Sequence, residues 1–147
     1  MQRANATVSS PAAVADVAPT PAVRAAPTWV IHIDTVGHQD ELDQCLWVRM
    51  DFTATAPIVG MHNFCGGDFV LDMVWGQTVQ LVGQGLDGTY LVTTDRVAFP
   101  GDSPSGVTTG IVATVFLQTC YWDREQGMRL VALTLLPEVP RVVAGAS

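Results

Sequence analysis

The sequence predicts an all-β protein, either a sandwich or a barrel of seven or more short strands. Three observations favour this fold class: short stretches rich in Val, Ile, Leu and Thr recur along the chain, turn residues separate them, and helical signals are few. Strands at such spacing are typical of sandwiches and barrels, whereas parallel sheets alternate strands with long helices.

Seven stretches are expected to form strands because apolar and β-branched residues dominate them and Gly, Pro or Asp bound them. They are Trp29–Ile33, Leu46–Phe52, Ile58–Met61, Thr78–Val82, Thr89–Thr94, Ile111–Cys120 and Met128–Leu135. Two further segments, Asp40–Leu46 and Phe69–Trp75, each have room for about two helical turns, and Gly76 suits a C-terminal cap of the second. Helix is therefore expected to be the minor element.

Composition divides the chain into three parts. Residues 1–28 consist mostly of Ala, Val, Pro, Thr and Ser, and the prolines oppose both helix and strand, so we expect a disordered linker or stalk. Residues 29–140 carry the strand pattern and are expected to form one domain, which agrees with a length of 147 residues. Residues 141–147 are expected to be a flexible tail.

The charge balance limits the possible partners. Seven Arg, no Lys and fourteen acidic residues give a formal net charge of −7, which has the wrong sign for a protein that follows a phosphate backbone, so no nucleic-acid partner is expected. No apolar run approaches the roughly 18–20 residues that cross a bilayer, so no membrane span is expected in this chain. No signal peptide is recognised, which leaves two locations open: inside the cell, or the cell surface or exterior if an export segment has been lost.

Cys120 is the candidate nucleophile. The chain has three cysteines, so at least one thiol is unpaired within a monomer. Cys120 ends an apolar stretch, and Arg129 opens the next one, so a hairpin would bring the two side by side. A guanidinium beside a thiol lowers the thiol pKa and stabilises an oxyanion.

The spacing of these residues resembles a known family. Leu117-Gln118-Thr119-Cys120, followed by Arg129 at the start of a last apolar strand, resembles the signature of the sortases, which are bacterial cysteine transpeptidases. Val59-Gly60-Met61-His62 resembles the stretch that carries their catalytic His, 58 residues before the Cys, with one residue inserted between Gly and His. The family's helix, turn and strand between His and Cys are matched by Leu71–Trp75, Gly76-Gln77-Thr78-Val79 and Tyr90-Leu91-Val92.

The resemblance implies a closed, sortase-like β-barrel of about eight strands with one or two short helices. It implies that Cys120 attacks a carbonyl in a Thr-containing sorting peptide and forms a thioester, with His62 as general acid and base and Arg129 as oxyanion stabiliser. An amine of a cell-wall precursor or a pilin lysine, or water, then takes the acyl group, as in bacterial protein anchoring. Thr119, Tyr121 and Trp122 are expected to bind the peptide, and no cofactor or metal is expected.

Alternatives remain open from the residues alone. Cys45 and Cys65 form a disulfide if the protein works in an oxidising compartment, which leaves Cys120 free. These three cysteines with His62 also make a formal Cys₃His set for zinc, as in a zinc-stabilised β-domain that binds a partner. A further alternative is a sortase-fold binding or structural module without turnover. The acidic stretch Asp40-Glu41-x-Asp43 is interpreted as a solvated loop.

Overall fold

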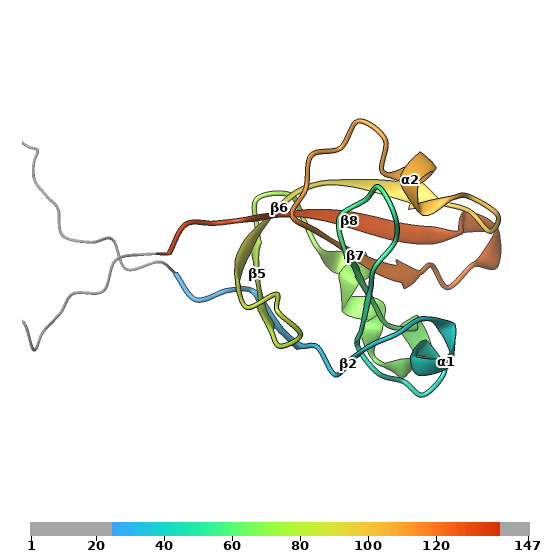
Figure 1. Cartoon of the computed structure of the whole chain (residues 1–147), viewed down its shortest axis with the longest axis horizontal. Coiled ribbons are helices and arrows are strands. Elements are labelled where there is room, and N and C mark those ends of the chain that lie inside the picture. The colour runs from blue at the N-terminus through green and yellow to red at the C-terminus, as the bar shows by residue number, and fades with distance from the viewer. Residues whose placement is uncertain (1–24, 139–147) are drawn as a thin grey trace, which may run out of the picture. The chain divides into compact units, whose positions relative to one another are not determined.

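Eight strands form one sheet in the computed structural model, which describes residues 25–138 (Figure 1). The folded body spans Pro27–Leu136. Of the predicted linker over residues 1–28, only 25–28 are described, and the predicted tail over 141–147 lies outside the described residues. The strands in chain order are β1 (Trp29–His32), β2 (Thr35–Val36), β3 (Val48–Met50), β4 (Ile58–Gly60), β5 (Thr78–Val82), β6 (Gly88–Ala98), β7 (Val115–Cys120) and β8 (Met128–Leu135).

The order of strands across the sheet is β1-β5-β6-β8-β7-β4-β3-β2. Three neighbouring pairs are parallel, namely β1 with β5, β4 with β7 and β2 with β3, and the other neighbours are antiparallel. The two edge strands, β1 and β2, are consecutive in the chain. In the two-residue segment that joins β1 to β2, the N–H of Ile33 donates to the carbonyl of Val82 at 2.8 Å, and the N–H of Asp34 donates to the carbonyl of Trp47 at 2.9 Å. The sheet therefore curls into a half-barrel of eight strands, which agrees with the predicted sortase-like barrel.

The helices are short. They are α1 (Gln39–Leu42) and α2 (Pro104–Val107), with the 3₁₀ segments η3 (Asn63–Cys65), η4 (Gly67–Asp72) and η5 (Arg124–Gln126). Within the described range, no helix is both long and apolar enough to cross a membrane.

Both predicted helices differ in extent from those observed. The helix predicted over Asp40–Leu46 is α1, which begins after His38 because the Glu41 carboxylate accepts from the His38 N–H at 2.8 Å. It stops before Cys45, whose φ of 60° lies in the left-handed region. The helix predicted over Phe69–Trp75 is the 3₁₀ segment η4, which starts two residues earlier and ends at Asp72.

Two elements, β2 and α2, were not predicted from the sequence. Strand β2 has two residues, which are too few to show the alternation of apolar and polar residues that predicts a strand. Helix α2 carries a recognisable start signal: Ser103 accepts from the N–H of Gly106 at 3.0 Å, and Pro104 occupies the first turn. That signal was present in the sequence but stood in a stretch dominated by turn residues.

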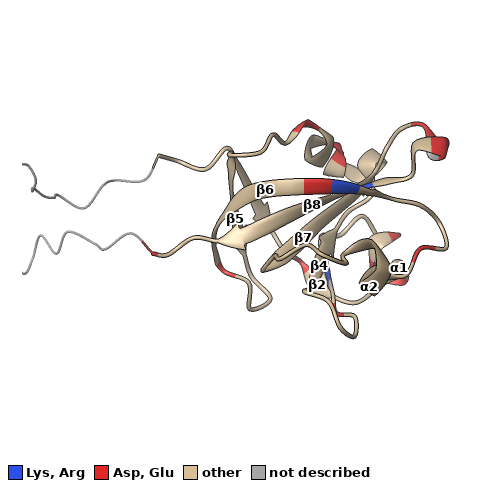
Figure 2. Cartoon of the chain, turned by 90° about the horizontal axis from the view of Figure 1, so that it is seen from above, with Lys and Arg blue, Asp and Glu red and all other residues tan. Residues whose placement is uncertain are grey.

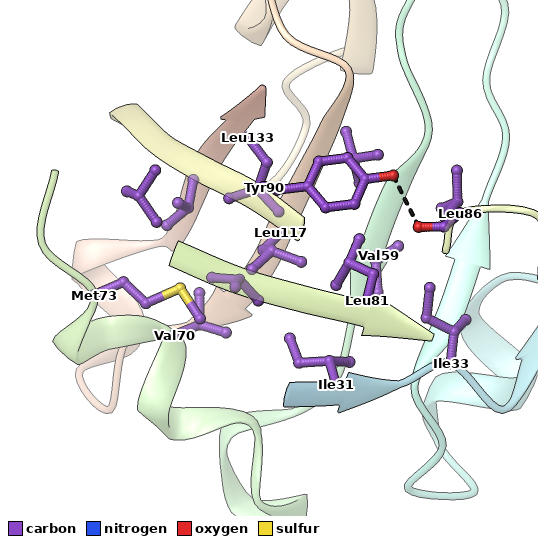
Figure 3. Packing of buried hydrophobic residues seen from close by; sticks show 14 residues of the cluster. Ile31, Ile33, Val59, Val70, Met73, Leu81, Leu86, Tyr90, Leu117 and Leu133 are labelled. Atoms are coloured by element: carbon purple, nitrogen blue, oxygen red, sulfur yellow. Dashed lines mark hydrogen bonds between the residues drawn. The ribbon is translucent and has the colours of Figure 1, made fainter. Parts of the chain in front are cut away.

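Two apolar clusters cover the two faces of the sheet. The inner cluster contains Leu117, Val131 and Leu133 and is closed by side chains of η4 (Figure 3). Within it the buried hydroxyl of Tyr90 donates to the carbonyl of Leu86 at 2.8 Å. We call this side of β7 and β8 the inner face.

The outer cluster contains Phe116, Leu130 and Ala132, which alternate along β7 and β8 with the inner-cluster residues. We call this side of the two strands the outer face. Strand β8 has neighbours on both sides and a cluster on each face, which explains its continuous apolar sequence.

Most acidic residues of the described chain lie away from the sheet (Figure 2). The acidic residues of the described chain lie mainly on loops and short helices, and β6 carries Asp95 next to Arg96 (Figure 2). Arg96 donates to the carbonyls of Val107 at 2.9 Å and Thr109 at 2.8 Å, so it fastens the segment around α2 to β6.

Candidate active site

Cys120 is the last residue of β7 and the free cysteine of the chain. Its register partner on β8 is Met128, so both side chains lie on the outer face. The thiol is half-buried, and this burial raises the pKa of Cys120 above its ordinary value. The thiol is therefore protonated at neutral pH and needs a base before it can act as a nucleophile.

His62 lies two residues after the end of β4, which runs parallel to β7. The N–H of Met61 donates to the carbonyl of Gln118 at 3.3 Å, and the hydroxyl of Thr119 donates to the carbonyl of Met61 at 2.9 Å. This pairing of neighbouring strands brings His62 next to Cys120, although the two residues are far apart in the chain.

The loop after His62 is fastened to the end of β7. The buried side-chain amide of Asn63 donates to the carbonyls of Cys120 at 3.0 Å and Tyr121 at 3.3 Å. The loop then turns back so tightly that a Cβ on Gly67 would lie 2.9 Å from the carbonyl oxygen of His62. Glycine is therefore required there, and the imidazole is carried by a compact loop.

Asp43 is the partner of the imidazole. Nε2 of His62 lies 2.8 Å from Oδ1 of Asp43, and the Phe64 ring stacks on the imidazole with centroids 4.7 Å apart. The hydrogen bond from His62, assisted by one from Gln39, holds the pKa of Asp43 below its usual value. Sequence reasoning missed Asp43 because it lies in an acidic stretch that was interpreted as a solvated loop, and no spacing rule links it to His62.

Cys45 and Cys65 form a disulfide with their Cα atoms 5.2 Å apart. It links the chain just after α1 to the end of η3. The bond removes two thiolates from the Cys₃His set with His62, so the structure contradicts the zinc-site alternative. Residues 25–138 hold no group of three or more His, Cys, Asp or Glu side chains placed to bind a metal ion.

Cys120 and His62 together line two cavities. The larger, about 510 Å³, is also bounded by the exposed rings of Phe64 and Trp122. The smaller, about 60 Å³, is also lined by Gln118. Gln118 lines a third cavity as well, of about 340 Å³, beneath α2. The thiol therefore borders two of the three cavities, and Gln118 borders the smaller of these two and the third. Within the described chain, no hydrogen bond joins the thiol to the imidazole.

Arg129 is not brought to this cavity. Its register partner is Thr119, so its side chain lies on the inner face, opposite to that of Cys120. Only 8% of Arg129 is exposed, and its guanidinium donates to Asp95 Oδ2 at 3.1 Å and to the carbonyl of Val70 at 2.8 Å. In this conformation Arg129 ties η4 to the sheet, and the predicted juxtaposition with the thiol is absent.

The three residues expected to bind the peptide differ in their positions. Tyr121 is half-buried and Trp122 is 63% exposed, and both line the large cavity. Thr119 is 2% exposed, and its hydroxyl is occupied by the Met61 carbonyl. This hydrogen bond therefore fastens Met61, the residue before His62, to β7.

The sequence matches no protein-family model, and no curated protein matches it. Solved structures do resemble the fold. Sortase C1 from Streptococcus suis aligns with a TM-score of 0.51 and 16% identity, covering 71% of this chain and 65% of that one. Sortase C1 from Streptococcus agalactiae, in its complex with MTSET, aligns with a TM-score of 0.50 and 16% identity, covering 74% and 64%.

The fold is sortase-like. This confirms the fold that the His, Cys and Arg spacing predicted. The chain spans less than two thirds of the length of either sortase C1. At this identity the likeness concerns the fold, and the chemistry of the sortase-like body has to be argued from its own residues.

Proposed function

We propose that this protein is a sortase-like cysteine transpeptidase. It would cleave a Thr-containing peptide through a thioester on Cys120 and transfer the acyl group to an amine or to water. The observation that carries the proposal is that the free thiol of Cys120 and the imidazole of His62 line the same cavities of a sortase-like fold.

The chemistry follows from the protonation state of the thiol. Because burial raises the pKa of Cys120, His62 takes the thiol proton as Sγ attacks the peptide carbonyl carbon. The tetrahedral intermediate collapses when the C–N bond breaks, and His62 returns that proton to the leaving amine. An incoming amine then loses a proton to His62 and attacks the thioester carbon. The C–S bond breaks, and His62 returns that proton to the Cys120 sulfur, which restores the thiol.

Gln118 is the best-placed donor for the developing oxyanion. It precedes Cys120 by two residues, so both side chains lie on the outer face. Its amide donates to the thioether of Met128 at 2.7 Å, and a thioether is a weak acceptor. A carbonyl oxygen of the substrate would replace that sulfur readily.

The oxyanion role of Arg129 stays a prediction. The guanidinium would have to leave both Asp95 and the Val70 carbonyl and cross to the outer face before it could contact the substrate. The roles of Tyr121 and Trp122 in peptide binding fit their positions at the large cavity, and Thr119 acts through the Met61 carbonyl.

The Cys45–Cys65 disulfide supports a location outside the cytoplasm, since disulfides persist in oxidising compartments. We therefore place the activity at the cell surface or exterior, with a peptide or protein as acyl donor and a cell-wall or pilin amine as acceptor. The large cavity beside the thiol leaves room for a peptide.

The test is intact-mass spectrometry of the protein and of Cys120→Ala after incubation with a library of Thr-containing peptides. We expect an adduct on the unmodified protein alone, removed by hydroxylamine as a thioester is. The chain has no Lys, so its side chains offer no amine that would complicate the assignment. His62→Ala is expected to slow adduct formation by about 10²–10⁴-fold.

A sortase-fold module without turnover is the second candidate. It is favoured by the raised pKa of Cys120 and by the lack of a hydrogen bond between the thiol and imidazole of the described chain. No adduct in the same experiment, together with slow alkylation of Cys120 by iodoacetamide, would establish this candidate instead.

A further inference from the structure

We propose that Asp43 is a positioning residue for His62 and that the Cys45–Cys65 disulfide holds the two in register. This inference rests on the proposed function, in which His62 moves the proton. It assigns a role to two features that the sortase resemblance did not identify, an acidic side chain just after α1 and a covalent link next to it.

The carboxylate of Asp43 decides which imidazole nitrogen carries the proton. An ionised carboxylate only accepts hydrogen bonds, so the 2.8 Å contact requires the hydrogen to be on Nε2 of His62. Nδ1 is then the nitrogen with a free lone pair, and it is the one that can take the thiol proton of Cys120. A residue that fixes the tautomer in this way acts on the chemistry without touching the substrate.

Two further contacts fix the geometry of the pair. Nε2 of Gln39 donates to the same Asp43 oxygen at 2.8 Å, which orients the carboxylate from within α1. The Phe64 ring lies nearly parallel to the imidazole, at an interplanar angle of 15°, and covers its face. The imidazole is thus held at its edge by Asp43 and at its face by Phe64.

The disulfide compensates for the exposure of Asp43. The Asp43 side chain is 60% exposed and lies at the end of a four-residue helix, and an exposed pair of this kind is weak by itself. Cys45 follows Asp43 by two residues and Cys65 follows His62 by three. A covalent link so close to both partners keeps them at a high effective concentration.

The first test is the tautomer of His62, read from long-range ¹H–¹⁵N spectra of protein labelled in histidine and assigned with His62→Gln. We expect the Nε2–H form in the unmodified protein and a mixture of tautomers in Asp43→Ala. Asp40→Ala, one turn earlier on the same helix, is the matched control and should leave the tautomer unchanged. An unchanged tautomer in Asp43→Ala would overturn the inference.

The second test is kinetic. Asp43→Ala should lower kcat for acyl transfer roughly 10-fold with little change in KM, a smaller loss than removing the base itself. Asp43→Glu should recover part of the rate. The double variant Cys45→Ser, Cys65→Ser should lose activity in the same direction, by about threefold, and a kcat equal to that of the unmodified protein in both variants would refute the role.

The two tests separate the two hypotheses. If the unmodified protein transfers no acyl group, the proposed function fails, whereas the tautomer still reports whether Asp43 orients His62. Circular dichroism melting of each variant identifies loss of folding. If the double variant melts at a usable temperature and retains the tautomer, the disulfide has no positioning role.

Discussion

The two faces of the β7–β8 hairpin have different uses. On the outer face, Cys120 and Gln118 border open cavities, and the amide of Gln118 has only a thioether as its acceptor. On the inner face, Thr119 and Arg129 are nearly completely buried, and both side chains donate hydrogen bonds to strong acceptors. The same two strands therefore present a thiol and an amide to open cavities on one side and make structural contacts on the other.

The difference shows how a pleated strand separates chemistry from stability. Neighbouring residues point to opposite faces, so a nucleophile and the residue before it have different surroundings. Burying a charge is costly unless it is paired, and Arg129 is paired with Asp95, which also accepts from the indole of Trp75 at 2.8 Å. The polar groups of the inner face are thus already hydrogen-bonded within the protein, whereas those of the outer face are available to a substrate.

The largest expected effect is on activity, from a change on the outer face. Cys120→Ala should abolish adduct formation because the nucleophile is gone, and should change the free energy of unfolding by less than about 1 kcal/mol. The matched inner-face change, Leu117→Ala, should cost about 2–5 kcal/mol by opening a cavity in the inner cluster. Mass spectrometry and urea unfolding measure the two effects. Strong destabilisation by Cys120→Ala would contradict the separation of the faces.

The next effect is on stability, from Arg129→Ala. Removing the guanidinium leaves Asp95 and the Val70 carbonyl without their donor, and we expect a loss of about 2–3 kcal/mol, or roughly 10 °C in Tm. Arg96→Ala, which removes contacts of an exposed guanidinium, is the control and should lose less than about 1 kcal/mol.

The same Arg129 variant decides its predicted catalytic role. Acyl transfer is measured well below the melting temperature, where the variant is still folded. A kcat close to that of the unmodified protein supports a purely structural role. A loss of 100-fold or more would mean that the guanidinium reaches the outer face during the reaction.

A smaller loss of rate is expected from Gln118→Ala. If its amide stabilises the oxyanion, kcat for thioester formation should fall about 10–100-fold, while the Tm stays nearly constant. Gln118→Asn, which keeps the amide on a shorter side chain, is the comparison. An unchanged rate in Gln118→Ala would remove this residue from the mechanism.

The smallest effect concerns pH. Because burial raises the pKa of Cys120, the rate of alkylation by iodoacetamide should rise with pH to a midpoint above that of the urea-unfolded protein. The same shift makes stability depend on pH. The folded state holds the thiol proton more tightly than the unfolded state does. The contribution of Cys120 to the free energy of unfolding is therefore complete below the unfolded pKa of about 8.5 and is lost as pH rises above it. A midpoint below that of the unfolded protein would indicate that His62 stabilises the thiolate.

Much of the fold was predictable because the strands carry a clear local pattern. The limits of β5 and β8 agree with the predicted ones, and the sortase-like arrangement followed from the order and spacing of His62, Cys120 and Arg129. The lengths of the helices were less predictable, since a single hydrogen bond from the His38 N–H to the Glu41 carboxylate and the left-handed residue Cys45 set the ends of α1.

The site was predictable only in part. The sequence suggested Cys120 and His62 as candidates, and the parallel pairing of β4 with β7 brings them to one cavity. It did not identify Asp43, because a hydrogen bond between segments 19 residues apart leaves no periodic signal. It placed Arg129 next to the thiol, whereas the register pairs Arg129 with Thr119 and turns it inward.

By itself, the sequence determined the all-β class, the limits of the strongest strands and the supply of reactive groups, because apolar period, turn residues and residue type are local properties. The tertiary structure decided which of these groups meet. Strand register turned Cys120 outward and Arg129 inward, and the fold of the loops joined Asp43 to His62 beside a disulfide. Such contacts depend on pairings between distant segments, and a one-residue change of register would reverse them.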